Sequence, residues 1–492
     1  MMSVTTEHLV PETGTDTDME EIDMKWNKMR MGAAAMLLCA NLMVLAGCGG
    51  TGTTTASGTA SAATVTTVSA SASTEATSDE ATASADTSTQ GAAPAGSPPD
   101  GGSGGASATV DHGSYATLVS ESASGTTYAS TGDAENAVRI EGASVTLTDV
   151  TVNKTAGVAA SGDTSNFYGS NAGLLALDGA TVVLDGATVT TSVEGANGIF
   201  SYGEGTTVTV NDATIRTTGD SAGGVMVTGG GTMYVNDSNI DTQGAHSAAL
   251  RTDRGGGTLV VDGGTYVSHG VGSPAIYSTA DITVSNATLT ATGSEAVVVE
   301  GKNSVALKNC SVTGTMAEVE GENLHNIMIY QSMSGDADSG TSAFDMEGGS
   351  LTANAGDMFY VTNTQCTIRL SDVGLVLSND VLLRVAGNSG TRNWGTVGSN
   401  GGTCAFTAEK QEMGGKIIVD EISGLTLSLT QGSVFTGSIN EAQEGGNVAV
   451  TLDASSKWVL TGDSYVTTLS GETGGIDLNG HVLYVNGVAW NG

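Results

Sequence analysis

A run of alternating apolar and polar residues, followed by a short turn of Asp, Asn or Gly, recurs along most of this chain. Six successive copies read TVVLDGATV, TVTVNDATI, TMYVNDSNI, TLVVDGGTY, DITVSNATL and SVALKNCSV. The apolar residues that close these copies lie 26, 25, 26, 23 and 23 positions apart: Val189, Ile215, Ile240, Tyr266, Leu289 and Val312. Because one copy cannot bury a face by itself, the copies must stack and share a core. The period predicts an all-β chain folded as a parallel β-helix, a solenoid.

A second strand pattern recurs once in each period, as NGIFSYG, GGVMVTG, SAALRTD, PAIYSTA and EAVVVEG. Side chains alternate between the two sides of a strand, so one column should point into the core and the next should point outward. The residues that we expect in the core are Phe200, Met226, Leu250, Ile276 and Val298. The outward column would then be Ser201, Val227, Arg251, Tyr277 and Val299.

The repeat predicts a β-helix over residues 111–440. Two segments depart from the pattern: residues 314–347 predict an extra hairpin or excursion, and residues 388–415 predict a long loop. Long loops on a regular scaffold often carry function. Residues 441–492 are expected to form the final coils and a C-terminal cap.

The composition suits short strands and tight turns, since 71 of the 492 residues are Gly and only 4% are aromatic. The chain has 52 acidic and 16 basic residues, which gives a formal net charge of −36. Such a surface repels phosphate backbones and anionic lipid headgroups. Nucleic acid is therefore excluded as an expected partner.

Residues 1–47 have the features of an export leader. Met24 opens the basic stretch MKWNKMR, and the apolar run that follows is of signal-peptide length. Seven acidic residues lie within residues 1–23, where a signal peptide normally carries positive charge, so translation is expected to begin at Met24. The closing LAGC resembles the lipobox of bacterial lipoproteins, although an ordinary secretory cleavage site is the alternative. The resemblance implies that Cys48 is acylated and becomes the first residue of the mature protein.

Residues 48–110 consist almost entirely of Thr, Ser, Ala and Gly and predict a disordered tether. The lipid on Cys48 would then be the only contact with the membrane. Three cysteines follow in the body of the chain: Cys310, Cys366 and Cys404. We expect them to be small buried core residues and not redox or catalytic groups.

Repeats such as GATVVLDGATV and GANGIFSYG resemble those of right-handed β-helix surface proteins of bacteria, among them pertactin-like passenger domains and adhesin-like lipoproteins. The resemblance implies a monomeric protein, lipid-anchored on the outer face of a bacterial membrane, that contacts glycans or ligands on host or neighbouring cells without catalysis. An outward stripe that contains Tyr234, Arg251 and Tyr277 would bind the sugar. The alternative is that outward Tyr residues are ordinary strand residues.

A polysaccharide lyase or glycoside hydrolase for acidic glycans is the alternative function, because many solenoid enzymes of this architecture act on such substrates. The segment HSAALRTDRGGG supplies the candidate catalytic residues His246, Arg251, Asp253 and Arg254. A lyase needs a base and carboxylates that hold Ca²⁺, and a hydrolase needs facing carboxylates. In the sequence pattern no second carboxylate stacks beside Asp253, which favours the non-enzymatic reading.

An ice-binding or purely structural surface protein is a second alternative, suggested by columns of Thr that Arg216 and Asp241 interrupt. For calcium, the segment GDADSG places Asp336 and Asp338 like the opening of a loop site. The later Gly and Glu of an EF-hand are missing, so a solvated acidic loop is favoured and no cofactor is expected.

Overall fold

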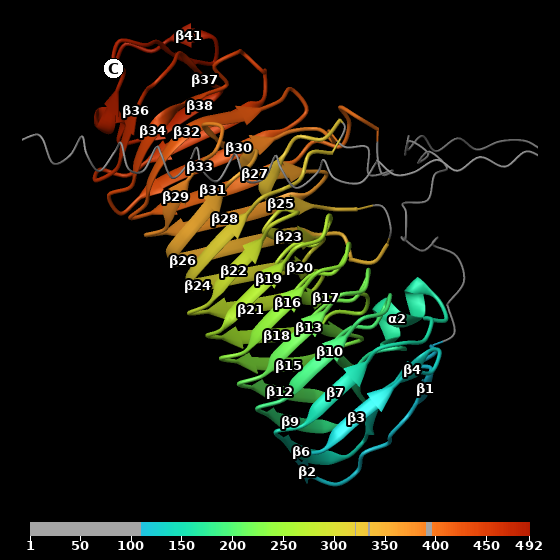
Figure 1. Cartoon of the computed structure of the whole chain (residues 1–492). Coiled ribbons are helices and arrows are strands. Elements are labelled where there is room, and N and C mark those ends of the chain that lie inside the picture. Colours follow the sequence, from blue (N-terminus) through green and yellow to red (C-terminus); the bar gives the residue numbers. More distant parts are fainter. Residues whose placement is uncertain (1–109, 320, 333–334, 390–395) are drawn as a thin grey trace, which may run out of the picture. The chain divides into compact units, whose positions relative to one another are not determined.

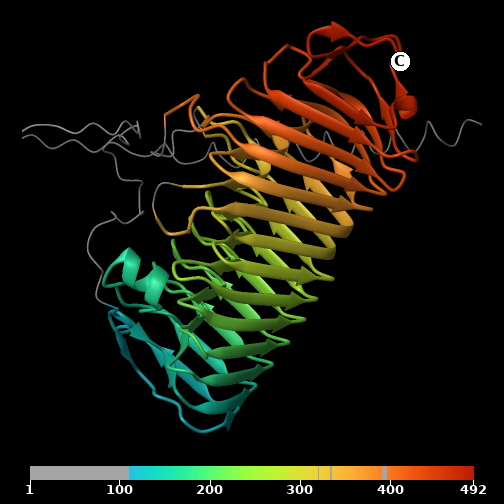
Figure 2. The same cartoon turned by 180° about the vertical axis from the view of Figure 1, so that it is seen from behind.

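The structure is a computed structural model that describes residues 110–492 except 320, 333–334 and 390–395. The expected leader, its start at Met24, the lipidation site Cys48 and residues 48–109 of the tether lie outside the described residues. The described body is a parallel β-helix. Its coils stack along one axis from the blue N-terminal end to the red C-terminal end (Figures 1 and 2).

Three strands make up each regular coil, and equivalent strands stack into three faces that we number in chain order. Faces 1 and 2 form a 22-stranded sheet and face 3 forms a 14-stranded sheet. In one coil, β9 (Thr181–Asp185) lies on face 1, β10 (Thr188–Thr191) on face 2 and β11 (Ile199–Tyr202) on face 3. These strands pair in parallel with β12 (Thr207–Asn211), β13 (Thr214–Thr217) and β14 (Val225–Thr228) of the next coil.

The remaining strands extend the same three faces. Face 1 also has β2 (Ala123–Ser124), β6 (Ser144–Thr148), β15 (Gly231–Asn236), β18 (Gly257–Asp262), β21 (Asp281–Ser285), β28 (Gln365–Ser371), β31 (Thr403–Glu409), β33 (Gly424–Thr430), β35 (Asn447–Leu452) and β38 (Thr468–Gly471). Face 2 has β3 (Thr127–Ser130), β7 (Thr151–Lys154), β16 (Asn239–Thr242), β19 (Thr265–Ser268), β22 (Thr288–Ala291) and β29 (Gly374–Val376), while β24 (Ser304–Gly314) and β26 (Thr341–Ala353) run through both. Face 3 has β5 (Val138–Glu141), β8 (Leu174–Leu177), β17 (Leu250–Thr252), β20 (Ile276–Ser278), β23 (Val297–Glu300), β25 (His325–Tyr330), β27 (Asp357–Thr362), β30 (Val381–Val385), β32 (Glu412–Val419), β34 (Val434–Ile439), β36 (Lys457–Val459) and β39 (Ile476–Asp477).

The inward side chains of the three faces make one continuous apolar core. On face 1, Val182, Val208 and Met233 stack in register on successive coils and are fully buried. Each such side chain contributes about 1.5–3 kcal/mol by leaving water. The alternation of small polar and aliphatic residues read from the sequence therefore sets the register on this face.

The three cysteines of the body belong to this core, as expected. Cys310, Cys366 and Cys404 are buried and free. Cys366 and Cys404 are register partners on adjacent coils. A hydrogen bond with Cys366, together with burial, raises the pKa of the Cys404 thiol well above its usual value.

The bend between faces 1 and 2 is made by the Asp, Asn and Gly residues of the repeat. Asp212 and Asp237 adopt left-handed backbone conformations, with φ of 49° and 45°, which Asp tolerates better than most residues. Beside them the side chains of Asp185, Asn211 and Asn236 form a hydrogen-bonded ladder, with N···O distances of 2.6 and 2.8 Å. The bend residues are thus turn formers that also tie neighbouring coils together.

The prediction of which side chains point into the core was wrong for some strands of face 3. Phe200, Met226, Arg251, Tyr277 and Val298 are register partners of one another and form a single column on the outer side. The core column contains instead the neighbours of these residues, including Val227 and Val299. Because other parts of the chain cover much of the outer side, both sides are apolar and the alternation carries little information there.

The two expected departures from the repeat are largely regular coils. Within residues 314–347, β25 and the start of β26 pair in register with their neighbours, so these described strands belong to regular coils. Within residues 388–415, β31 and the start of β32 are likewise regular strands. Loose sequence periodicity in both segments comes from long connections between strands.

The coils change shape after β29. From Ser371 to Val385 the chain advances 14 positions, whereas between their register partners, Glu409 and Val419, it advances only 10. The shorter segment runs directly from the bend after face 1 into β32, which pairs with the strands of face 3. Face 2 therefore ends at β29, and the later coils have two faces.

Smaller sheets close the two ends of the described body. At the N-terminal end β1 (Ser114–Tyr115) pairs with β4 (Glu135–Asn136). At the C-terminal end β37 (Ser464–Val466), β40 (Leu483–Val485) and β41 (Val488–Ala489) form a three-stranded sheet, and a 3₁₀ turn at Thr473–Gly475 lies between β37 and β40 in the chain. No helix among the described residues is long and apolar enough to cross a membrane.

Candidate functional site

A short helix, α2 (Gly162–Tyr168), lies over the outer side of face 3. Ser161 starts the helix through a capping box, in which its hydroxyl accepts a hydrogen bond from the Thr164 amide and its own amide donates to the Thr164 hydroxyl. Gly169 ends the helix in a left-handed conformation with φ of 72°. The segment SGDTSNFYG carried these signals, but the repeat analysis did not find the helix.

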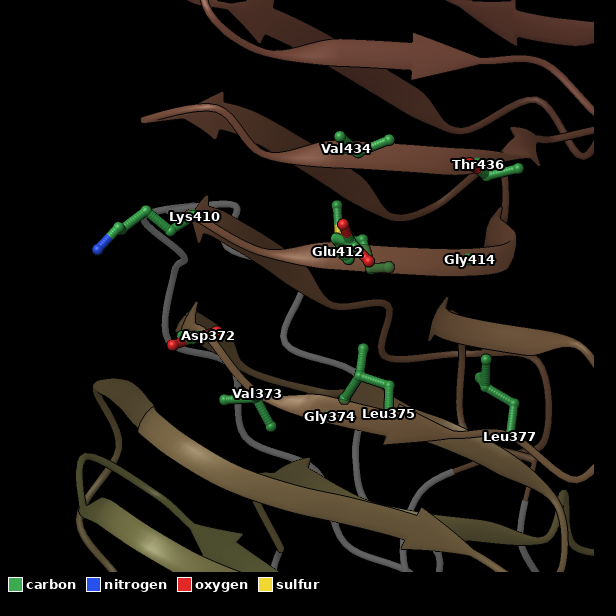
Figure 3. A pocket seen from close by; sticks show the side chains of 11 residues that line it. Asp372, Val373, Gly374, Leu375, Leu377, Lys410, Glu412, Gly414, Val434 and Thr436 are labelled. Atoms are coloured by element: carbon green, nitrogen blue, oxygen red, sulfur yellow. The ribbon is translucent and has the colours of Figure 1, made fainter. Parts of the chain in front are cut away.

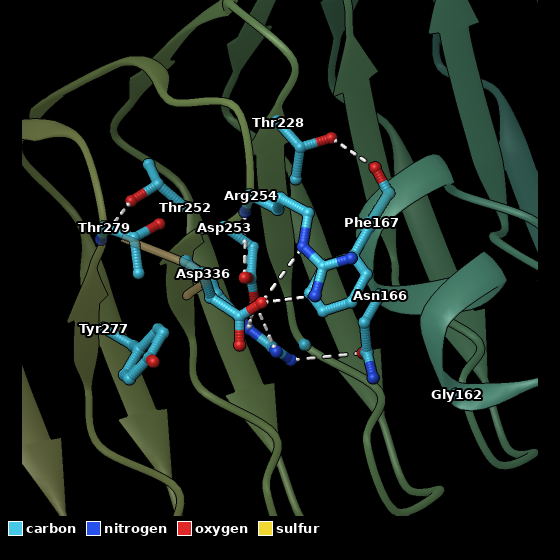
Figure 4. Close-up of polar contacts among 12 residues, drawn as sticks. Gly162, Asn166, Phe167, Thr228, Thr252, Asp253, Arg254, Tyr277, Thr279 and Asp336 are labelled. Carbon is cyan, nitrogen blue, oxygen red and sulfur yellow. Dashed lines mark hydrogen bonds and ion pairs between the residues drawn. The ribbon is translucent and has the colours of Figure 1, made fainter. Parts of the chain in front are cut away.

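Beside this helix the outer column of face 3 is buried. Leu175, Phe200 and Met226 form a small apolar cluster outside the main core. Val298, Met328 and Tyr360 form another one further along the same column. Between these two clusters the column carries Arg251 and Tyr277, and polar side chains gather around them (Figure 4).

Arg251 holds a buried carboxylate at the centre of the polar cluster. Its Nε and Nη2 atoms donate to Oδ2 of Asp253 at 3.1 and 2.6 Å, and its Nη1 donates to Asn166 of α2 at 3.2 Å. Burial raises the pKa of Asp253, and the Arg251 charge partly opposes that shift. The guanidinium also lies 5.7 Å from the centre of the Tyr277 ring. Arg251 thereby joins face 3 to the helix.

Arg254 joins the same helix to a distant connection. Its guanidinium lies 3.9 Å from the centre of the Phe167 ring, a cation–π contact, and it pairs with Asp336 in the segment between β25 and β26. Thr228 donates to the backbone carbonyl of Phe167 at 2.7 Å. Figure 4 shows these contacts converging from α2, from the strand ends and from Asp336.

Glu300 is a second buried acid of the cluster. Its carboxylate accepts hydrogen bonds from the hydroxyls of Tyr277, Tyr330 and Ser332. Burial raises the pKa of Glu300, and the three hydrogen bonds partly offset that effect. Burial and the nearby Glu300 charge raise the pKa of Tyr277 well above its usual value. Sequence analysis missed Glu300, although an acid that ends the apolar run VVVE was a signal for a buried polar group.

The structure brings together Arg251, Asp253, Arg254 and Tyr277. His246 stands apart, because it is an exposed turn residue with φ of 54°. Tyr234 lies on β15 of face 1, a different sheet from Arg251 and Tyr277, and is 41% exposed. The expected ligand stripe is thus not one surface, and Tyr277 is half-buried, with the Arg251 guanidinium near its ring.

The two carboxylates of the calcium candidate each have a cationic partner. Asp336 pairs with Arg254, and Asp338 pairs with Lys302 at 2.7 Å. The hydrogen bond and charge of Lys302 lower the pKa of Asp338. Among the described residues no group of three or more His, Cys, Asp or Glu side chains could hold a metal ion.

The chemistry open to the polar cluster follows from its burial. The Asp253 side chain is 4% exposed and that of Arg251 is 14% exposed. A glycosidase acid and base must both reach a bound sugar, and a lyase base must reach the substrate carbon. In this arrangement the cluster instead fastens α2 and the connection before β26 to face 3.

The family model described as "Right handed beta helix region" matches residues 136–319. This range covers most of the three-faced coils and the central residues of the polar cluster. The fold is therefore a right-handed parallel β-helix, a class that includes adhesins, lyases and hydrolases, so the fold alone does not fix an activity. Comparisons with curated proteins and with solved structures found no significant match.

Proposed function

We propose that this chain is a non-catalytic surface protein, anchored to a bacterial membrane through Cys48, that binds glycans on face 1. The observation that carries the proposal is Tyr234, an exposed aromatic ring on β15 of face 1, with Thr and Asn in the outward columns on either side. An aromatic face with a polar tip suits a sugar, which has both apolar C–H faces and hydroxyls.

The surroundings of Tyr234 offer regularly spaced hydrogen-bonding groups. In its own column it lies between Thr209 of β12 and Val260 of β18. The columns on either side point in the same direction because side chains alternate along a strand. They contain Thr207, Thr232 and Thr258 on one side and Asn211, Asn236 and Asp262 on the other. The coil repeat of about 4.8 Å sets the spacing of these groups, which favours an extended glycan chain.

The absence of catalysis is proposed because the acids most suited to it are buried and already engaged. Asp253 is bound by Arg251, and Glu300 by three hydroxyls. We further propose a monomer on the cell surface, with host or neighbouring-cell glycans as ligands and no nucleic acid. The net charge of −36 supports that exclusion.

A glycan array tests this proposal with the full-length chain, the variant Tyr234→Ala and the control Tyr115→Ala. Tyr115 is a matched control because it is also 41% exposed and lies on β1, away from face 1. Saturable binding that Tyr234→Ala weakens and Tyr115→Ala leaves unchanged is the expected result. Binding that is equal in all three proteins, or no binding to any glycan, would contradict the assignment to face 1.

An enzyme of acidic glycans remains the second candidate, because two acids with raised pKa values, Asp253 and Glu300, lie in one cluster. Incubation with acidic polysaccharides should yield neither new reducing ends nor unsaturated uronate. Turnover that is lost in Asp253→Asn and Glu300→Gln would replace the binding proposal. An ice-binding role is disfavoured, because the Arg216–Asp241 ion pair, at 3.4 Å, breaks the threonine columns of face 2.

A further inference from the structure

A groove opens where face 2 ends. It has a volume of about 700 Å³ and lies between β29 on one side and the first half of β32 on the other (Figure 3). Leu375 and Leu377 line the β29 side, and Glu412, Met413 and Gly414 line the β32 side. The groove exists because the shortened coil carries β32 away from β29, and no strand of the described residues lies between them.

One edge of β29 faces this groove without a strand partner. Among the described residues β29 pairs only with β26. In a parallel ladder a residue directs both its N–H and its C=O to the same neighbour, and successive residues alternate. Ser311 and Gly374 occupy equivalent positions on successive coils, because both are register partners of Ser350. Ser311 donates its N–H to a carbonyl of the preceding coil, so Gly374 has the same orientation. Leu375 therefore directs its N–H and C=O away from β26, into the groove.

At the end of the groove, the side chain of Gln411 makes the two backbone hydrogen bonds that one residue of a paired strand would make. Its Oε1 accepts from the Val373 N–H at 2.8 Å and its Nε2 donates to the Val373 C=O at 2.7 Å. The same Nε2 donates to the Glu412 C=O at 2.6 Å, so Gln411 bridges the two edges. Val373 and Leu375 are two positions apart and face the same side, so the next groups that such a strand would bond are those of Leu375.

The floor of the groove is the core itself. Met413 belongs to the main core, and Leu375 and Leu377 are only partly buried against it. An occupant that places an aliphatic side chain here would continue the apolar stack of the solenoid. On the rim stand Asp372, Lys410 and Glu412, two acids and one base, on a chain with a net charge of −36. An acidic occupant is therefore disfavoured.

We propose that this groove binds an uncharged, extended segment of a partner protein, which adds a strand between β29 and β32. The peptide pairs through its main chain with the Leu375 edge and directs alternate aliphatic side chains onto Leu375, Leu377 and Met413. The groove lies between β29 and β32, so a single slender strand fits it better than the broad sheet edge of a second copy. This proposal does not depend on glycan binding at face 1.

The test uses the capped peptide Thr-Thr-Val-Thr-Val-Asn as its probe, which is the sequence of residues 206–211 and is a face 1 strand within this solenoid. A second probe has the same side chains but N-methylated amides at alternate positions. Binding of each to the full-length chain is measured by fluorescence anisotropy, and the bound state by hydrogen exchange. We expect saturable binding of the first probe, at least about tenfold weaker binding of the second, and new protection over residues 372–378 and 411–415.

The protein variant Leu375→Pro removes the N–H that faces the groove, and Val376→Thr is its control because Val376 is 55% exposed. Leu375→Pro should abolish binding and Val376→Thr should retain it, with circular dichroism confirming that both fold. Leu377→Lys, just beyond the strand, tests the apolar floor if the proline variant unfolds. Equal binding of both probes, protection elsewhere, or no binding of the unmethylated probe overturns the proposal. A concentration-dependent dimer that Leu375→Pro or Leu377→Lys disrupts would overturn the choice of partner.

Discussion

Arg251 and Asp253 lie two positions apart at the end of β17, and both guanidinium-to-carboxylate hydrogen bonds end on the same oxygen, Oδ2 of Asp253. The pair occupies the outer side of face 3, where the neighbouring coils place Met226 and Tyr277. Covered by α2 and paired with each other, the two charges serve as a structural fastening.

Removing one partner should reveal this fastening. Arg251→Ala leaves the buried Asp253 without its cation, so the free energy of unfolding should fall by about 3–5 kcal/mol. The exposed pair of Arg216 and Asp241 gives the control, and Arg216→Ala should cost less than about 1 kcal/mol. Urea denaturation of both variants measures the difference. If the two variants were equally stable, the pair would have no structural role.

The second buried acid makes stability depend on pH. Because Glu300 has a raised pKa in the folded protein, the unfolded chain loses this proton first as pH rises. Stability from this group is therefore greatest below the unfolded value of about 4.3 and falls as pH rises through the window up to the folded pKa. Asp253 acts in the same direction.

Glu300→Gln should flatten this dependence, since an amide can still accept hydrogen bonds from Tyr277 and Tyr330 but does not ionise. Relative to the natural chain, the variant should gain stability as pH rises above about 4.3, the unfolded value of the Glu300 pKa, as judged by the urea midpoint. Glu347→Gln, at an acid 54% exposed beside Lys308, is the control and should not flatten the curve. An unchanged pH profile in Glu300→Gln would mean that Glu300 ionises normally.

The thiols of the core should be unreactive until the protein unfolds. Cys310, Cys366 and Cys404 are buried, and burial raises the pKa of Cys310 as well as that of Cys404. Since the thiolate is the reactive form, alkylation should be slow in the native chain and complete in guanidinium chloride. Mass spectrometry of the peptides measures the extent of alkylation at each cysteine. Rapid native labelling at any of the three positions would show that the local packing opens.

Acylation at Cys48 predicts that the chain takes up an alkyne-tagged fatty acid in a bacterial host. Cys48→Ser should abolish the label and release the protein from the membrane fraction, whereas Cys39→Ser should retain both. Cys39 is a fair control because it lies within the apolar run of the same leader. Label that persists in Cys48→Ser would place the anchor elsewhere.

Sequence periodicity predicted face 1 and the bend well, because there the outer side meets solvent and every second residue is polar. On face 3 the same method assigned Phe200, Met226 and Val298 to the wrong side. Their column is buried by α2 and by connections from distant parts of the chain, and no local pattern records such cover. Arg251, Asp253 and Arg254 could be recognised as unusual from their types, but their partners Asn166 and Asp336 lie more than 80 positions away.

The end of face 2 at β29 has a mechanical consequence. Along most of the described rod, three hydrogen-bonded ladders hold each coil to the next, but only those of faces 1 and 3 continue past β29. A load pulling along the axis would be carried by two ladders at this junction and by three in the coils before it. Because the third side is unpaired there in the described part of the chain, the rod should bend more easily at this junction than in the three-faced coils before it.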